Sequence, residues 1–205
     1  MKIFLDTAIV TDIEDRMPTG IIKGVTTNPT LIRRSGEDPD VVYEEIINAG
    51  ITDLSIEVKG DDAETLVANG ILYNSKYGDK ATIKLPCTVE GIKACKTLSI
   101  LKIKTNMTLI FSVSQAILCA LAGATYVSPF VGRLDQIGED GIGLISQIAT
   151  TFCIHDCKTQ ILAASLRSAQ SAADAYEAGA HICTVPVEVF DDMSTHVLTD
   201  KGLAQ

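Results

Sequence analysis

Eight short strand-like runs recur along the chain at intervals of about 20 to 35 residues, with stretches of helical character between them. The runs are residues 2–6, 24–28, 53–58, 81–86, 104–110, 126–131, 159–165 and 181–186. This interval is the length of one strand-plus-helix unit. Because no linker or change of composition interrupts the series, residues 1–205 are predicted to form one α/β domain. The expected architecture is a single (β/α)₈ (TIM) barrel with eight parallel strands, at the short end of the size range for that fold.

The stretches between the runs carry helix signals. Residues 61–73 begin with acidic residues and continue with apolar residues at helical spacing. The same pattern occurs in residues 89–101, 114–122, 141–153 and 168–178. Gly50, Gly123 and Gly179 follow helical runs, where a C-terminal glycine cap belongs. An open doubly wound sheet is the alternative fold, but it calls for a glycine-rich phosphate loop after an early strand, and the sequence has neither GxGxxG nor a P-loop.

Composition excludes several classes of function. Hydrophobic residues make up 46% of the 205, which indicates a folded globule. The formal net charge of −9 and the lack of a dense Lys/Arg cluster argue against a nucleic-acid partner. No apolar run approaches the roughly 18 residues of a membrane span, and the N-terminus has no basic-then-apolar signal pattern. We therefore expect a cytoplasmic protein that does not bind membranes.

The six cysteines form no CxxC pair and no zinc-like repeat. Cys153 and Cys157 are four residues apart with His155 between them, a spacing that would suit a metal. The same spacing describes two small buried positions on a helix, which is the favoured interpretation. The cysteines are therefore expected to be free thiols, and no metal site is predicted.

The run ATIKLP carries a lysine, Lys84, in the middle of an apolar strand. A strand alternates its faces, so Lys84 shares one face with Thr82 and Pro86. An ammonium group in such a place must be paired, extend to solvent or be chemically useful, because burying it unpaired is costly. Taken alone, Lys84 is most simply an edge-strand lysine that points to water.

The other runs change that interpretation, because one parity in each is the more polar. The polar parity holds Phe4 with Asp6, Thr26 with Asn28, Ser55 with Glu57, Asn106 with Thr108, Ser128 with Phe130, and Ala163 with Ser165 and Arg167. In a barrel, inward residues at the C-terminal strand ends form the mouth, where the chemistry of this fold occurs. Thr26 or Ser55 alone would be an ordinary hydrogen-bonded core residue. The set of Asp6, Asn28, Glu57, Lys84, Asn106 and Thr108 would make a poor core and is predicted to be a site.

A lysine in a mostly apolar barrel loses hydration, which favours its neutral, nucleophilic amine. Such an amine forms a Schiff base with a ketone, and the iminium withdraws electrons from a neighbouring C–C bond. Asp6 and Glu57 are available to move the protons that bond cleavage and imine formation require. Arg133, Ser165 and Arg167 follow two late strands, and arginine suits phosphate, which barrels often bind in that region.

Eight segments together resemble the small transaldolase family, which is related to fructose-6-phosphate aldolases. They are DTA near the N-terminus, GVTTNPT, IEV, IKLP, KTNMTLIFS, AGATYVSPFVGRLD, ILAASLR and GAHICTVP, in order over nearly the whole chain. The resemblance implies a (β/α)₈ barrel with Lys84 as the Schiff-base lysine and no cofactor. It also implies a homo-oligomer, a pentamer or decamer in the family. Relatives continue past LTDKG into a further helix that contacts neighbouring subunits, whereas this chain is shortened and ends at Gln205.

The resemblance assigns roles residue by residue. Asp6 is implied as the acid/base for C–C cleavage, and Glu57 with Thr108 as the groups that manage the water of imine chemistry. The implied substrate-binding residues are Asn28, Asn106 and Ser128 at the hydroxyls and the Schiff base, and Arg133, Ser165 and Arg167 at the phosphate.

Two positions separate transferase from aldolase within this resemblance. The aldolases have glutamine where Glu57 stands and tyrosine where Phe130 stands, so this chain has the transaldolase residue at both. The expected activity is transfer of dihydroxyacetone between sugar phosphates, from sedoheptulose 7-phosphate to glyceraldehyde 3-phosphate in the pentose phosphate pathway. The alternative is a fructose-6-phosphate aldolase that releases free dihydroxyacetone. A sugar-phosphate-binding barrel without catalysis would be favoured only if Lys84, Asp6 or Glu57 were replaced.

Overall fold

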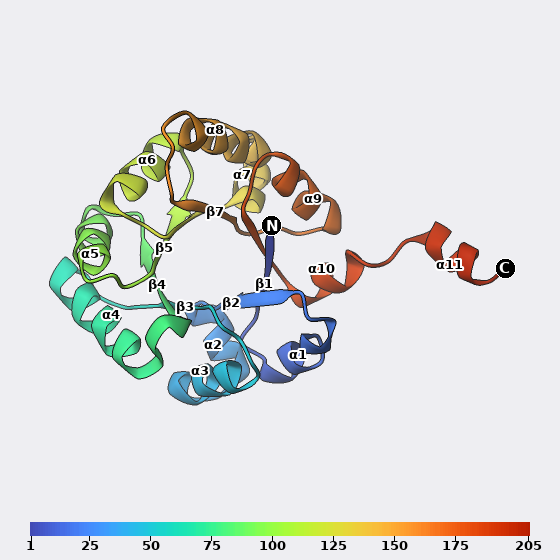
Figure 1. Cartoon of the computed structure of the whole chain (residues 1–205), viewed down its shortest axis with the longest axis horizontal. Coiled ribbons are helices and arrows are strands. Elements are labelled where there is room, and N and C mark those ends of the chain that lie inside the picture. Colours follow the sequence, from blue (N-terminus) through green and yellow to red (C-terminus); the bar gives the residue numbers. More distant parts are fainter.

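The computed structural model describes all 205 residues, and its centre is a closed barrel of eight strands in chain order (Figure 1). The strands are β1 (Lys2–Asp6), β2 (Ile22–Thr26), β3 (Leu54–Glu57), β4 (Ala81–Pro86), β5 (Thr105–Ile110), β6 (Tyr126–Pro129), β7 (Gln160–Ala163) and β8 (Ile182–Val185). Every neighbouring pair is parallel, and β8 pairs with β1 to close the ring. The predicted (β/α)₈ barrel is confirmed.

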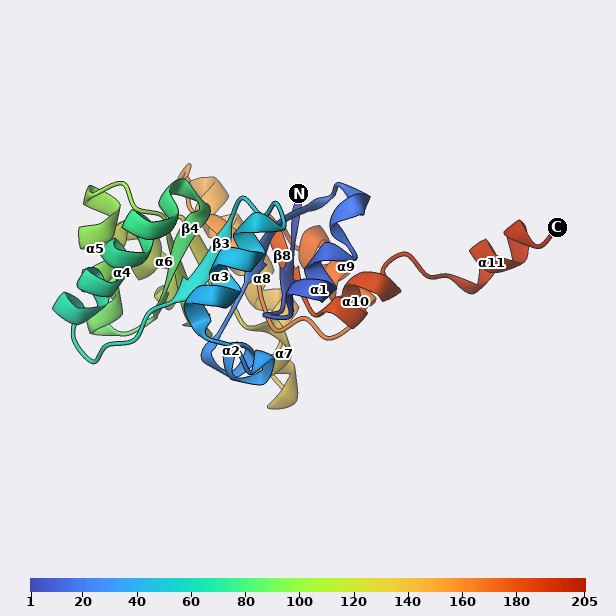
Figure 2. The ribbon, with the colours of Figure 1, turned by 90° about the horizontal axis from the view of Figure 1, so that it is seen from below.

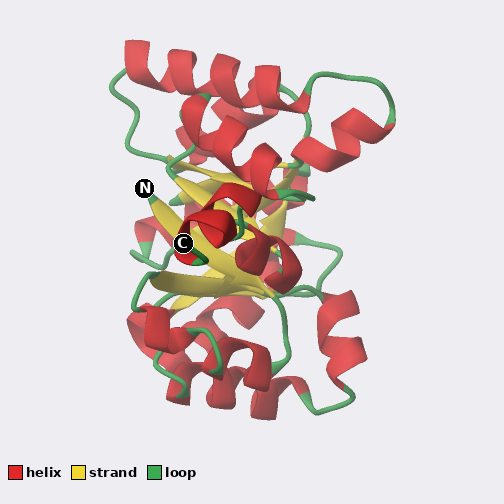
Figure 3. Cartoon of the chain, turned by 90° about the vertical axis from the view of Figure 1, so that its right-hand side faces the viewer, coloured by secondary structure: helices red, strands yellow, loops and turns green.

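Helices surround the strands (Figure 3). They are α1 (Val10–Glu14), α2 (Pro29–Ser35), α3 (Pro39–Asn48), α4 (Ala63–Tyr77), α5 (Val89–Ile100), α6 (Val113–Ala122), α7 (Val131–Gln136), α8 (Gly141–Ile154), α9 (Ala169–Glu177), α10 (Val187–Asp192) and α11 (Val197–Leu203), with short 3₁₀ turns η1 (Met17–Thr19) and η2 (Gly78–Lys80). The helix α11 extends away from the barrel and has no buried residue (Figure 2). None of the helices combines the length and apolar character needed to cross a membrane.

Local sequence determines where the helices begin and end. Eight of them start at a side chain that accepts a hydrogen bond from the first helical turn: Asn28 for α2, Asp38 for α3, Asp62 for α4, Thr88 for α5, Ser112 for α6, Asp140 for α8, Ser168 for α9 and His196 for α11. Such caps satisfy backbone N–H groups that have no partner within the helix. Gly50, Gly123 and Gly179 have positive φ after α3, α6 and α9, as predicted.

The hydrophobic core is divided by the barrel wall. A large cluster of 44 buried residues fills the space between the strands and the helices, and it includes Leu54, Ile83 and Met107. A small cluster of Phe4, Tyr126, Leu162, Ala164 and Ile182 lies on the other face of the strands. Phe4, Tyr126 and Ile182 precede Asp6, Ser128 and Thr184 by two residues on their strands. They therefore form a floor one layer below the mouth of the barrel.

Two predicted runs, residues 24–28 and 126–131, extend past the ends of their strands to residues that were assigned to the site. β2 ends at Thr26, and Asn28 instead caps α2 by accepting hydrogen bonds from the backbone N–H groups of Thr30 and Leu31. β6 ends at Pro129, and Phe130 retains only an isolated bridge to Ala164.

The inward parity predicted for the seventh strand was wrong. Ala163 packs in the outer core, whereas Leu162 and Ala164 belong to the inner cluster. Ser165 still reaches the mouth because its φ of 60° breaks the alternation of the strand just after β7 ends.

Candidate active site

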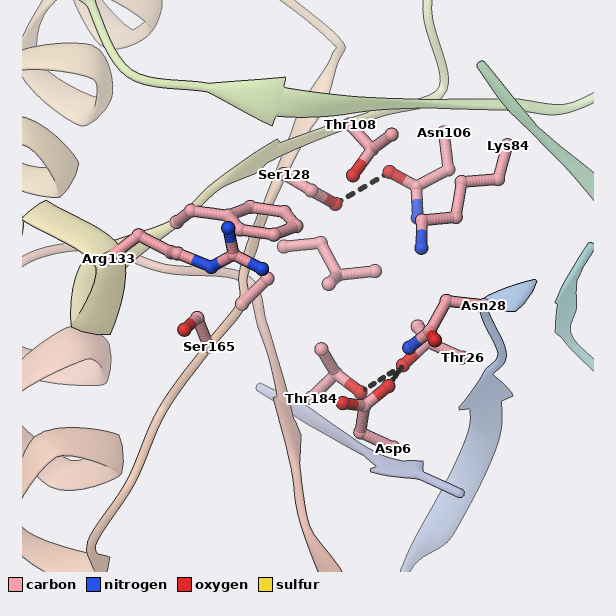
Figure 4. A pocket seen from close by; sticks show the side chains of 13 residues that line it. Asp6, Thr26, Asn28, Lys84, Asn106, Thr108, Ser128, Arg133, Ser165 and Thr184 are labelled. Carbon is pink, nitrogen blue, oxygen red and sulfur yellow. Dashed lines mark hydrogen bonds between the residues drawn. The ribbon is translucent and has the colours of Figure 1, made fainter. Parts of the chain in front are cut away.

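A cavity of about 160 Å³ opens at the C-terminal ends of the strands (Figure 4). Nine of its thirteen lining residues are those predicted from the sequence: Asp6, Asn28, Lys84, Asn106, Thr108, Ser128, Phe130, Arg133 and Ser165. Of the other four, Leu162, Ala164 and Thr184 were not singled out by the sequence, and Thr26 was placed on the polar parity but interpreted as a core residue. Two predicted residues, Glu57 and Arg167, do not line this cavity.

Lys84 is buried on β4, with 8% of its surface exposed. Its Nζ donates to the carbonyl oxygen of Thr27 at 3.1 Å and lies 3.0 Å from Oε2 of Glu57. The sequence-based picture of an ammonium in apolar surroundings was therefore wrong. The charge is paired instead, because parallel pairing sets Glu57 beside Lys84 on the adjacent strand.

Glu57 contacts Lys84 although it does not line the cavity. Its side chain is 29% exposed and also borders a separate depression formed with Arg33, Lys59 and Tyr73. One oxygen of the carboxylate is therefore beside the amine, while part of the group remains in contact with solvent. This arrangement suits a group that exchanges protons with both Lys84 and water.

Asp6 ends a short relay of hydroxyl groups. Thr26 Oγ1 donates to Asp6 Oδ1 at 2.8 Å and lies 2.6 Å from Oγ1 of Thr184. Because the single proton of Thr26 points to Asp6, Thr184 donates to Thr26. Burial raises the pKa of Asp6, and the hydrogen bond from Thr26 and the charge of Lys84 act in the opposite direction.

Asn106 is fixed by hydrogen bonds on both sides of its amide. Ser128 Oγ donates to Asn106 Oδ1 at 2.6 Å, and Asn106 Nδ2 donates to Ser55 Oγ at 3.2 Å. Asn106 also pairs in register with Lys84. The amide is thus held in one orientation beside the amine.

Thr108 carries a buried hydroxyl that has no hydrogen-bond partner in the protein. It lines the cavity on the same side as Ser128 and Asn106 (Figure 4). An unpartnered buried hydroxyl costs about 1–3 kcal/mol, so this atom is suited to bind a polar group that enters the cavity. Asn28 can also bind a polar group in the cavity through its side-chain Nδ2, because only its Oδ1 is used in capping α2.

Arg133 and Ser165 lie across the cavity from Lys84 (Figure 4). Arg133 is an exposed residue of α7, so its guanidinium can reach a ligand at the entrance. Arg167 is also exposed and borders an adjoining depression that shares Ser165 with the main cavity. Phe130 lines the cavity, and its ring contacts that of Phe111 at 5.8 Å between centroids.

This geometry combines an amine, two carboxylates and a cationic entrance. The amine and Glu57 can exchange a proton directly, while Asp6 is separate from that pair and connected to two threonines. An elongated molecule could therefore bind with an electrophilic carbon at Lys84 and an anionic end at Arg133. No three His, Cys, Asp or Glu side chains come together as a metal site.

Comparison with known proteins gives matches over nearly the whole chain. The sequence model of the family described as Transaldolase/Fructose-6-phosphate aldolase matches residues 3–205. A probable transaldolase of Clostridium acetobutylicum is 49% identical over 203 residues, covering 99% of this chain and 94% of the relative. Probable transaldolases of Lactiplantibacillus plantarum and Halalkalibacterium halodurans are 47% and 46% identical, each over 100% of this chain and over 94% and 96% of their own lengths.

Proposed function

The chain belongs to the transaldolase/fructose-6-phosphate aldolase family of enzymes, and we propose that it transfers a dihydroxyacetone unit between sugar phosphates through a Schiff base on Lys84. The donor is a ketose phosphate such as sedoheptulose 7-phosphate or fructose 6-phosphate. The acceptor is an aldose phosphate such as glyceraldehyde 3-phosphate or erythrose 4-phosphate. The observation that carries this proposal is the pairing of buried Lys84 with Glu57 at the edge of a cavity that also holds Asp6.

Schiff-base formation begins with removal of a proton from Lys84. Glu57 Oε2, 3.0 Å from Nζ, accepts that proton, and the free amine adds to the ketone carbon of the donor. The hydroxyl of the resulting carbinolamine takes a proton and leaves as water, which gives the iminium. The unpartnered hydroxyl of Thr108 is suited to hold this water.

Cleavage of the C–C bond requires a base at the hydroxyl of the departing aldehyde. Asp6 takes that proton, the bond between the third and fourth carbons of the ketose breaks, and its electron pair moves toward the iminium to give an enamine. The burial that raises the pKa of Asp6 makes its carboxylate a stronger base. The two hydroxyls of Thr26 and Thr184 keep the carboxylate oriented.

Transfer reverses these steps with a second aldehyde. The enamine carbon attacks the acceptor carbonyl, and protonated Asp6 returns its proton to the new hydroxyl. Water then attacks the iminium, and the product ketose leaves Lys84 as the amine recovers its proton from Glu57. Asn106 Nδ2 gives one of its two hydrogens to Ser55, so the second N–H is available to donate to a substrate oxygen near the imine.

The substrate phosphate binds at the cationic entrance. Arg133 and Ser165 border the main cavity opposite Lys84, and Arg167 lies on the other side of Ser165. A phosphate beside Ser165 would receive charge-assisted hydrogen bonds from the two arginines. The span between this entrance and Lys84 favours a substrate that carries its phosphate at the far end from its ketone.

The choice between transferase and aldolase depends on the lifetime of the enamine. Release of free dihydroxyacetone requires protonation of the enamine and then attack of water on the imine. The resemblance to transaldolases at Glu57 and Phe130 supports transfer, because a phenyl ring offers no hydrogen bond to orient that water. The alternative product, free dihydroxyacetone, would indicate a fructose-6-phosphate aldolase.

One assay separates the two reactions. Purified protein is supplied with fructose 6-phosphate, with and without erythrose 4-phosphate, and both dihydroxyacetone and sedoheptulose 7-phosphate are measured. With fructose 6-phosphate as the only substrate, a transaldolase releases little dihydroxyacetone. It turns over steadily once erythrose 4-phosphate is added. Release of dihydroxyacetone as fast as transfer would replace the proposal with the aldolase.

A further inference from the structure

Two cysteine sulfurs are in contact between the C-terminal end of β4, the strand that carries Lys84, and helix α6. Cys119 Sγ donates a hydrogen bond to Cys87 Sγ at 3.6 Å. Cys87 is half-buried and directly follows β4, the strand that carries Lys84, whereas Cys119 is buried in α6. The two thiols are 32 residues apart in the chain and meet because β4, which directly precedes Cys87, lies beside β5, which precedes α6 (Figure 1).

The other four cysteines do not form such a pair. Cys95 is buried and shares a hydrogen bond with the Thr105 hydroxyl, and Cys183 is buried and donates to a backbone carbonyl. Cys153 is exposed and Cys157 half-buried at the end of α8, and neither is hydrogen-bonded to another thiol. The contact between Cys87 and Cys119 therefore singles out one pair of thiols.

We propose that Cys87 and Cys119 form a redox-reactive pair, which a peroxide converts to a disulfide that slows catalysis at Lys84. The thiolate of Cys87 attacks one peroxide oxygen, the O–O bond breaks, and Cys87 becomes a sulfenic acid while the other oxygen leaves as water. The thiol of Cys119 then attacks the Cys87 sulfur, the S–S bond forms, and a second water leaves. The two thiols lose two electrons and two protons, and hydrogen peroxide is reduced to two waters.

The surroundings of the two thiols assign these roles. The hydrogen bond from Cys119 lowers the pKa of the Cys87 thiol, although burial acts against it. The same hydrogen bond, together with burial, raises the pKa of Cys119. Cys87 is also the more accessible of the two sulfurs. It is therefore the attacking group, and Cys119 is the thiol that resolves the sulfenic acid.

A disulfide at this position would act on the active site through the backbone. The two sulfurs must move about 1.5 Å closer to reach a normal S–S length. Cys119 is held in the buried face of α6, so Cys87, in the connection after β4, takes up most of the movement. The N–H of Cys87 donates to the carbonyl of Thr108 at 3.0 Å, and Lys84 lies three residues earlier. Oxidation therefore displaces Lys84 and Thr108 relative to each other.

Peptide mapping tests the bond independently of the proposed function. Fully reduced protein is treated with hydrogen peroxide, free thiols are blocked with N-ethylmaleimide, and the protein is digested with trypsin without reductant. Cleavage at lysine and arginine places Cys87 in residues 85–93, Cys119 in 105–133 and Cys95 in 94–96. The expected species joins the first two peptides and is two hydrogen atoms lighter than their sum. Linkage through Cys95, Cys153, Cys157 or Cys183, or no linkage at all, would overturn the proposal.

Turnover of the same samples tests the effect on the site. Oxidised protein should lose activity by about tenfold or more, because displacements near 1 Å at a reacting group have effects of that size. Dithiothreitol should restore it. Cys87→Ser and Cys119→Ser should match the reduced wild type and resist peroxide, whereas the control Cys153→Ser should remain sensitive. Formation of the mapped disulfide with full activity, or equal inactivation of Cys87→Ser, would contradict the proposal.

Discussion

Glu57 and Lys84 occupy matching positions on β3 and β4, and their charged groups lie 3.0 Å apart. Strand pairing therefore fixes a carboxylate beside the amine. A pair held in this way avoids the cost of an unpaired buried charge and keeps a proton acceptor in place before substrate arrives.

Replacing Phe130 should change the fate of the enamine. In Phe130→Tyr, a phenol can orient water near the imine, so release of dihydroxyacetone from fructose 6-phosphate should rise relative to transfer. Adding Glu57→Gln should move the balance further toward release. Phe111→Tyr is the matched control, because Phe111 contacts Phe130 without lining the cavity. An unchanged ratio of release to transfer in both Phe130 variants would contradict the role given to this position.

The hydrogen bond from Thr26 should control the acid limb of the pH profile. It lowers the pKa of Asp6, so Thr26→Val should raise that pKa further and move the acid limb of kcat/KM to higher pH. The acid limb moves up with the pKa because Asp6 acts as a base, and it loses function as the pH falls through that pKa. Thr82→Val, which breaks a hydrogen bond to Asp53 outside the cavity, should leave the limb in place. A shift to lower pH in Thr26→Val would refute the assignment of Asp6.

Thr108 should show opposite effects on activity and stability. Thr108→Val removes a buried hydroxyl without a protein partner, so the melting temperature should not fall. Turnover should drop by about tenfold or more, because the group that holds the water of imine chemistry is lost. Thr159→Val removes a hydroxyl that donates to Ala124 at 2.8 Å, so this control should lose stability but retain activity. Full turnover in Thr108→Val would exclude the proposed water-binding role.

The two arginines should discriminate substrates by their phosphate. Arg133→Ala and Arg167→Ala should each weaken the binding of fructose 6-phosphate by about tenfold to a hundredfold, since charge-assisted hydrogen bonds contribute about 1.5–3 kcal/mol. Unphosphorylated fructose should be used almost as well as by the wild type. Arg34→Ala is the control, because Arg34 is an exposed arginine of α2. Equal losses for both substrates would mean that the arginines do not bind the phosphate.

The barrel and most of the cavity lining could be predicted because both follow from local rules. The alternation of a strand determines which face a residue takes, so the polar parity of β1, β3, β4 and β5 identified residues that meet at one mouth. Asn106 illustrates this, since its place beside Lys84 follows from strand order alone once the barrel closes.

The remaining features depend on closure of the barrel and on irregular backbone. Thr184 meets Thr26 although 158 residues separate them, and nothing local in HICTVP indicates that contact beyond the parity of Thr184. Ser165 adopts a left-handed conformation, so it reaches the mouth although Ala163, two residues before it, faces the outer core. The apolar setting expected for Lys84 was wrong because the charge that pairs with it comes from another strand.

Borohydride trapping shows whether Lys84 forms the Schiff base. Protein is incubated with fructose 6-phosphate, reduced with borohydride, and digested for mass mapping of the modified residue. Our expectation is one reduced adduct, on Lys84, and neither adduct nor turnover in Lys84→Met. An adduct on Lys23 or Lys59 in the intact protein, or trapping that persists in Lys84→Met, would contradict it.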